Sequence, residues 1–168
     1  MGLLDFFKNE DQAEVKKYSG LYDQLAVEYQ QISEKDLVVL SCIAGLMARV
    51  AYVDFDLHEN EVKKMKELIQ SWNQKLEFDH EITTDMAIKY VREMAGIDNH
   101  LLVHPLKSHL NPDQRYQVLQ MLFLIAASDG NVAGIESEEI RIITKGLELT
   151  NQHFLAARAE VSEFFLTR

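Results

Sequence analysis

The chain has 168 residues, of which 47% are apolar and 26% charged, a composition typical of one globular domain. Its formal net charge of −10 argues against nucleic acid as a partner and against adsorption to an anionic membrane, because both carry negative charge. The single cysteine, Cys42, excludes an internal disulfide and suits a reducing compartment.

Residues 1–32 open with a small apolar segment that contains Leu3, Leu4, Phe6 and Phe7. This stretch has no basic region before it and is too short for a signal peptide. We expect the segment to dock on the rest of the domain rather than on a partner or a membrane surface. A helical pattern follows it, with apolar residues spaced three to four apart.

Residues 33–168 carry helical patterns and no convincing strand. The helices that we predict begin at Ser33, Glu59, Thr83 or Thr84, Asn99, Asn111, Glu136 and Thr150 or Asn151. The predicted helix from Asn99 ends or restarts at Pro105, because proline lacks an N–H. The apolar run Leu37 to Val53 is slightly short for a membrane span, so a buried helix is favoured and no transmembrane segment is predicted. The sequence therefore predicts an all-α bundle of seven to eight helices with the N-terminus packed on it.

An internal repeat becomes visible when the sequence is shifted by the interval between Asp54 and Asp129. The same shift places Asp56 on Asn131 and Glu61 on Glu136, with apolar positions matching on both sides. Each copy reads as an apolar helix, an acidic loop and an amphipathic helix. Because one such hairpin cannot cover its own apolar face, we predict two copies related by a pseudo-twofold axis.

The second copy carries the pattern Ala126-x-x-Asp129-Gly130-x-Val132, followed by Glu136. With its apolar helix before and its periodic helix after, this pattern resembles the tellurite-resistance TerB-like family over about residues 37–165. In the first copy Asp54 and Glu61 match the family motif, and Phe55 departs from the glycine usual after the aspartate. Because phenylalanine replaces glycine at this position, we expect the backbone of the first loop to differ in shape from that of the second. Arg115 lies where such proteins often carry an arginine.

The resemblance implies a small, acidic, cytoplasmic helical module linked to tellurite and oxidative-stress resistance and to phage or colicin tolerance. Proteins of this family are proposed to bind divalent cations and to work in larger, partly membrane-linked protein complexes. A similar domain is part of a membrane-anchored J-domain co-chaperone.

The acidic loops suggest a hard-cation site, because Ca²⁺ and Mg²⁺ prefer oxygen ligands. The candidate metal ligands are Asp54, Asp56, Glu61, Asp129, Asn131 and Glu136. Neither loop is an EF-hand, since Met65 and Ile140 occupy the twelfth positions where a bidentate glutamate is needed. The alternative is structural: an aspartate that makes a turn and a glutamate that caps the next helix explain the same pattern.

No catalytic motif accompanies these acids, and no nucleophile elbow, phosphate loop or zinc-protease helix is present. His100 and His104 are four apart, but no further ligand completes a zinc set, and a solvent-exposed role is favoured. The sequence predicts a non-enzymatic interaction module that binds divalent cations and protein partners. The alternative is an adaptor domain with no metal role.

Overall fold

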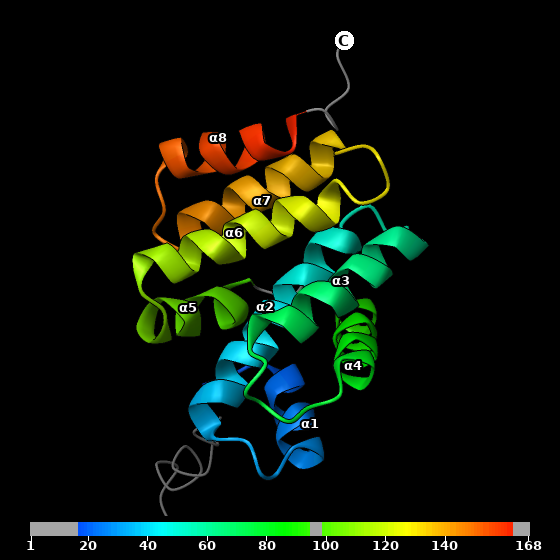
Figure 1. Cartoon of the computed structure of the whole chain (residues 1–168), viewed down its shortest axis with the longest axis vertical. Coiled ribbons are helices and arrows are strands. Elements are labelled where there is room, and N and C mark those ends of the chain that lie inside the picture. The colour runs from blue at the N-terminus through cyan, green and yellow to red at the C-terminus, as the bar shows by residue number, and fades with distance from the viewer. Residues whose placement is uncertain (1–16, 95–98, 163–168) are drawn as a thin grey trace, which may run out of the picture.

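The structure is a computed structural model and describes residues 17–94 and 99–162. Every regular element within these ranges is an α-helix. The helices are α1 (Gly20–Glu28), α2 (Glu34–Ala51), α3 (Glu59–Trp72), α4 (His80–Glu93), α5 (His100–His109), α6 (Pro112–Ala126), α7 (Gly134–Gly146) and α8 (Asn151–Glu160) (Figure 1). The predicted all-α bundle is confirmed, and the pseudo-twofold relation of its hairpins stays a prediction.

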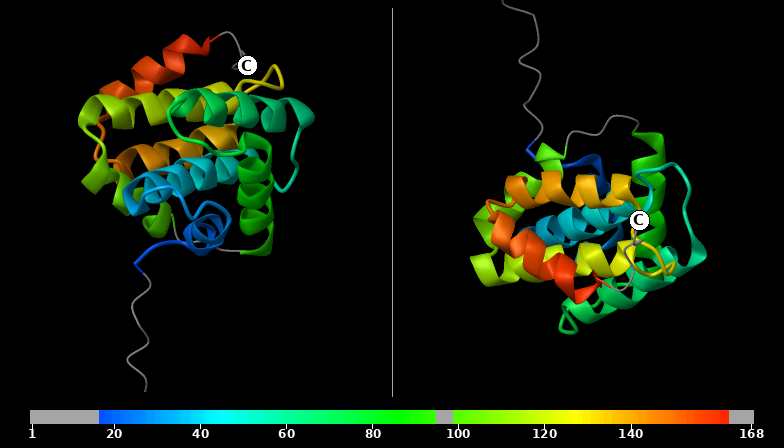
Figure 2. Two further views of the ribbon diagram at one scale, coloured as in Figure 1. Left: turned by 60° about the horizontal axis from the view of Figure 1, so that its bottom comes forward. Right: turned by 90° about the horizontal axis from the view of Figure 1, so that it is seen from above.

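Helix α2 is the centre of the bundle and packs against α1 and against every helix from α3 to α7. It is buried on nearly all sides, because even the small residues between its large apolar ones are covered. Seen from above, α2 lies between α6 and α7 (Figure 2, right). Helix α8 packs on the outside of α6 and α7, with Phe154 inserted against Phe123. A helix that is apolar all round belongs in this central position.

Two helix starts predicted from local sequence are confirmed. The Ser33 hydroxyl accepts a hydrogen bond from the backbone N–H of Asp36 at 3.2 Å at the start of α2. At the start of α6, Asn111 and Gln114 bond each other's backbone N–H groups at 2.9 and 3.0 Å. Proline at the first helical position completes this second start.

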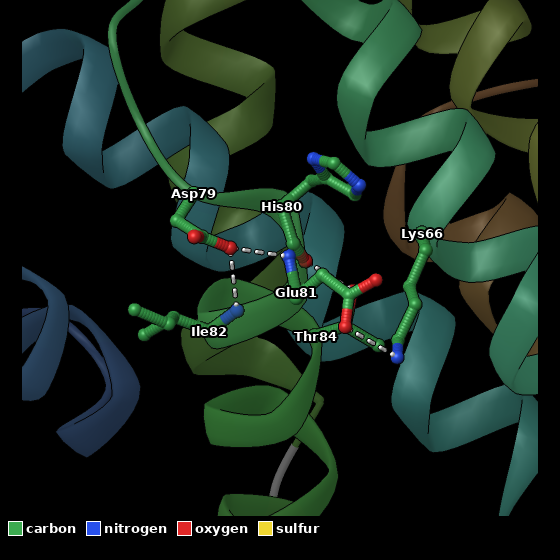
Figure 3. Close-up of polar contacts among 6 residues, drawn as sticks. All are labelled: Lys66, Asp79, His80, Glu81, Ile82 and Thr84. Atoms are coloured by element: carbon green, nitrogen blue, oxygen red, sulfur yellow. Dashed lines mark hydrogen bonds and ion pairs between the residues drawn. The ribbon is translucent and has the colours of Figure 1, made fainter.

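The predicted start of α4 at Thr83 or Thr84 is wrong. Asp79 caps this helix, because its carboxylate accepts the backbone N–H groups of Glu81 at 2.8 Å and Ile82 at 3.0 Å (Figure 3). Lys66 of α3 adds an ion pair to Glu81 at 3.1 Å. Both threonines lie inside the helix and are buried.

The predicted break at Pro105 is also wrong, because α5 runs through this residue without interruption. Proline leaves the carbonyl four residues earlier, that of Leu101, without its helical N–H partner. The Cys42 thiol of α2 lies 3.9 Å from this carbonyl oxygen and donates to it. Burial raises the pKa of Cys42 to about 12, so the thiol keeps the proton that it donates. The packing of α2 on α5 thus supplies a hydrogen-bond donor to the Leu101 carbonyl, in place of the N–H that Pro105 lacks.

Some predicted features lie outside the described residues. One of these is the apolar segment Leu3 to Phe7. Helix α1 begins at Gly20, and the Ser19 side chain caps it by accepting the backbone N–H of Tyr22.

Candidate functional site

The loop between α2 and α3 and the loop between α6 and α7 make the same turn. In the first, the Asp54 carboxylate accepts the backbone N–H of Asp56 at 3.0 Å. In the second, the Asp129 carboxylate accepts the backbone N–H of Asn131 at 2.9 Å. Both are aspartate turns, in which the side chain takes the place of a backbone carbonyl. The equivalence of Asp54 and Asp129, predicted from the sequence, holds for their hydrogen bonds.

The two glutamates of the repeat also occupy equivalent positions, each as the third residue of its helix. Glu61 accepts the backbone N–H of His58 at 2.9 Å, and Glu136 accepts that of Ala133 at 2.7 Å. Each carboxylate therefore binds a backbone group that the helix itself leaves unsatisfied. This is the capping role that we considered as the alternative to metal binding.

The backbone turns through the left-handed region at the same position in both loops. Gly130 has φ +92°, and Phe55, its counterpart, has φ +64°. The expectation that Phe55 gives the first loop a different shape is therefore wrong in this respect. A side chain at positive φ is strained by roughly 1–2 kcal/mol. The Phe55 ring offsets some of this cost by an edge contact with Tyr52, with ring centroids 5.7 Å apart.

The two loops lie at the same end of the bundle (Figure 1). In the interior at this end, Glu61 and Glu136 lie close together. They are only 2% and 5% exposed, and their carboxyl groups lie close enough to shift the pKa of each other. A hydrogen bond between two carboxyl groups requires a proton, since two carboxylates offer only acceptors. We refer to Glu61 and Glu136 as the carboxyl pair.

Burial is the main reason why the pKa of both members of the carboxyl pair is raised. For Glu136, the nearby Glu61 carboxyl group and the charge of Asp129 add to burial, the bond from Ala133 opposes it, and the pKa rises to about 8. For Glu61, the negative charges of Asp129 and Asp54 add to burial, and the bond from His58 and the nearby Glu136 carboxyl group oppose it. The carboxyl pair therefore holds one proton at neutral pH.

No positive side chain within the described residues forms an ion pair with the carboxyl pair. The nearby Glu139 shows the contrast: this buried carboxylate receives Arg49 Nε at 3.0 Å and Asn99 Nδ2 at 2.6 Å. Glu139 is neutralised by protein groups, whereas the carboxyl pair is left to be neutralised by a proton or by another cation.

The remaining predicted metal ligands lie outside the carboxyl pair. Asp56 is exposed, and the carboxylates of Asp54 and Asp129 are engaged in their own turns. The side-chain oxygen of Asn131 is buried, and no described group donates to it. Among the residues that the structure describes, no three His, Cys, Asp or Glu side chains are gathered closely enough to hold a metal ion. A bound ion would therefore rely on two carboxylates and keep water in its shell, as Mg²⁺ commonly does.

Sequence analysis missed the contact between the two loops, because it treated each loop as a separate ligand set. It also missed the role of Arg115, whose Nη1 donates to the backbone carbonyl of Leu147 at 2.5 Å at the end of α7. Both contacts join residues far apart in the chain. The only available signal for the first was the equal position of Glu61 and Glu136 in the repeat.

The described part of the chain contains no helix that combines the length and the apolar character needed to cross a membrane. The family of tellurite resistance protein TerB matches residues 40–159, which is 120 of the 168 residues and covers both acidic loops. No curated protein and no solved structure gives a match.

Proposed function

The chain belongs to the TerB family of tellurite resistance proteins, and from this premise we propose that it is a binding module whose carboxyl pair takes up a divalent cation. The observation that carries the proposal is the contact between Glu61 and Glu136 in the interior. Two buried carboxyl groups that no cation of residues 17–94 or 99–162 neutralises need a proton or a metal ion. The proposed role is one of binding and includes no reaction.

The cation would bind at one shared site between the loops rather than at two separate ones. Glu61 and Glu136 would be the direct ligands, and Asp54 and Asp129 would add negative charge around the site. The unpaired oxygen of Asn131 offers a further acceptor in the second loop. Ca²⁺ and Mg²⁺ suit these oxygen ligands, and Mg²⁺ suits a site with two carboxylates and several waters.

Cation binding at this site must compete with the shared proton. Because the pKa of Glu136 is raised to about 8, the carboxyl pair still carries a proton at neutral pH. An ion that binds both carboxylates displaces this proton, so affinity should rise with pH and binding should release acid. A cation bound only by exposed surface carboxylates would displace no proton near pH 7, since ordinary carboxyl groups are already ionised there.

The test is a titration of the full-length protein with Mg²⁺ or Ca²⁺ alone, followed by backbone amide shifts and by proton release in weak buffer. We expect shifts at His58, Glu61, Ala133 and Glu136 and a release approaching one proton per chain near pH 7. The double variant E61Q/E136Q should lose both signals. The matched control is E138Q, the same change on an exposed glutamate of α7.

Two results would contradict cation binding at the carboxyl pair. One is the absence of shifts at millimolar ion concentration. The other is a double variant E61Q/E136Q that binds as tightly as the parent chain. Either result would leave the glutamates with their capping role and favour the adaptor function.

The adaptor function has its own support in α7. Ile135 and Ile142 lie two turns apart on this helix, and each is 50% exposed. Large apolar side chains on one exposed helix face are suited to contact with a protein partner. If this face binds a partner, I135E/I142E should abolish capture of that partner, whereas chelation of divalent ions and E61Q/E136Q should not.

A further inference from the structure

A cleft separate from the carboxyl pair lies between the C-terminal ends of α2 and α4. It encloses about 290 Å³. The lining residues that matter here are Tyr52, Val53, Phe55, Val91, Arg92 and Met94. Phe55 and Met94 are 77% and 50% exposed, so the rim of the cleft presents large apolar groups to water. Its size is at the lower limit for small-molecule sites, so it suits a few side chains better than a cofactor.

Arg92 gives this apolar cleft a positive charge. Its guanidinium lies over the Tyr52 ring, 5.5 Å from the centroid, and no carboxylate of the described residues forms an ion pair with it. The other arginine of the cleft, Arg49, is already bound to Glu139 at 3.0 Å. An occupant that complements the cleft therefore combines large apolar side chains with one carboxylate.

The chain carries a segment with this chemistry at its N-terminus, Leu3-Leu4-Asp5-Phe6-Phe7. We propose that this segment docks in the cleft of its own chain, with Asp5 on Arg92 and with leucine and phenylalanine side chains against Phe55 and Met94. The proposal is independent of cation binding, since it uses neither Glu61 nor Glu136. It assigns a partner to the exposed, strained Phe55.

The described end of the chain is close enough for this docking. Helix α1 packs on α4, and the start of α1 at Ser19 and Gly20 lies close enough to Tyr90 to affect the pKa of its hydroxyl. Tyr90 precedes the cleft residues Val91, Arg92 and Met94 by one turn of α4 or less. Residues 8–16 connect Phe7 to the described part and can span up to about 30 Å. The segment therefore has ample length.

Because the N-terminal segment is covalently attached to the domain, weak contacts are sufficient to keep it docked in the cleft. A short flexible tether gives an effective concentration in the millimolar range, so a contact with a Kd of about 1 mM is already half occupied. Burial of a leucine or phenylalanine side chain is favourable because it removes apolar surface from water. Two such side chains and a charge pair can meet this requirement.

The test is disulfide trapping in the full-length protein with cysteines introduced by F6C and M94C. The matched control is F6C/L155C, because Leu155 is 49% exposed on α8, away from the cleft. The native Cys42 is 2% exposed and should not compete. We expect the intramolecular disulfide of F6C/M94C to form about tenfold faster than that of the control.

Charge variants test the assigned ion pair in the same assay. Asp5→Arg or Arg92→Glu should slow trapping up to about fivefold, and the double variant D5R/R92E should restore it. Equal trapping rates for F6C/M94C and the control would overturn the proposal, as would disulfide-linked dimers as the main product. A spin label attached at F6C in a chain that keeps Met94 provides a second measurement. The label should broaden the Met94 methyl resonance. A Met94 resonance as sharp with the spin label as without it would likewise contradict docking.

Discussion

The α2–α3 loop and the α6–α7 loop form the same hydrogen bonds with partly different residues. Both use an aspartate turn and a glutamate that binds a backbone N–H three residues earlier. They differ at the left-handed position, which is Phe55 in the first loop and Gly130 in the second. They also differ at the residue before the helix, which is His58 in the first loop and Ala133 in the second. The shared features are those that position Glu61 and Glu136. The differences fall on residues that affect the strain and the capping of each loop separately.

The largest expected effect concerns the carboxyl pair that the two loops share. Because the pKa of both glutamates is raised in the folded protein, the folded state holds protons that the unfolded state has already lost. Stability should therefore be fully present below the ordinary pKa of about 4.5 and fall as pH rises through about 8. We expect a loss on the order of 3 kcal/mol in this window.

Urea unfolding between pH 4 and pH 9, in the presence of a chelator, measures this loss. The double variant E61Q/E136Q should remove most of the pH dependence, and E138Q should leave it unchanged. Stability that stays level from pH 5 to pH 8 in the parent protein would show that the carboxyl pair is ionised in the folded state. Added Mg²⁺ should restore stability at high pH if the cation replaces the proton.

The next effect tests the left-handed position. Gly130→Phe places in the second loop the residue that the first loop tolerates, at φ +92°. Apart from the adjacent residues, no atom of the described part of the chain lies within 4 Å of the added Cβ, so we expect a cost of about 1–2 kcal/mol from backbone strain alone. The urea midpoint should fall with an unchanged slope. A loss far above this range would mean that the second loop makes contacts that the glycine alone permits.

A smaller effect separates the two helix starts. His58 Nδ1 accepts the backbone N–H of Asn60 at 3.2 Å, whereas Ala133 offers no side-chain acceptor to α7. Ala133→Ser should therefore stabilise the protein by about 0.5–1 kcal/mol. Ser33→Ala, which removes an existing cap of α2, is the matched change in the opposite direction. If A133S gives no gain in thermal stability, Glu136 already satisfies this helix start.

The smallest effect is expected for Phe55→Gly. This change relieves the strain at φ +64° but removes the edge contact with Tyr52, and each is worth about 1 kcal/mol. We expect the free energy of unfolding to change by less than about 0.5 kcal/mol. Half-occupied docking of the N-terminal segment adds only about 0.4 kcal/mol, which lies within this range. A much larger loss would show that the Phe55 ring makes a stronger contact than Tyr52 and the docked segment supply.

The predictions that succeeded depend on neighbours in the chain. The Asn111–Pro112 start was predictable because the cap, the proline and Gln114 lie within one turn. The errors arose where distant groups decide. Thr83 does not cap α4, because its buried hydroxyl lies 3.0 Å from the Tyr29 hydroxyl of the α1–α2 connection, and Asp79 takes the capping position. Pro105 does not end α5, which packs closely on α2.

The same division applies to the candidate site. The sequence by itself offered turns at Asp54 and Asp129 and helix caps at Glu61 and Glu136 as one of two interpretations, because these contacts span two or three residues. It also determined the family and the all-α fold, through the motif and the helical spacing of apolar residues. Only the packed bundle decided that the two glutamates meet. Their contact depends on where α3 and α7 are placed by the packing of both on α2 and α6, and that same burial raises the pKa of both carboxyl groups.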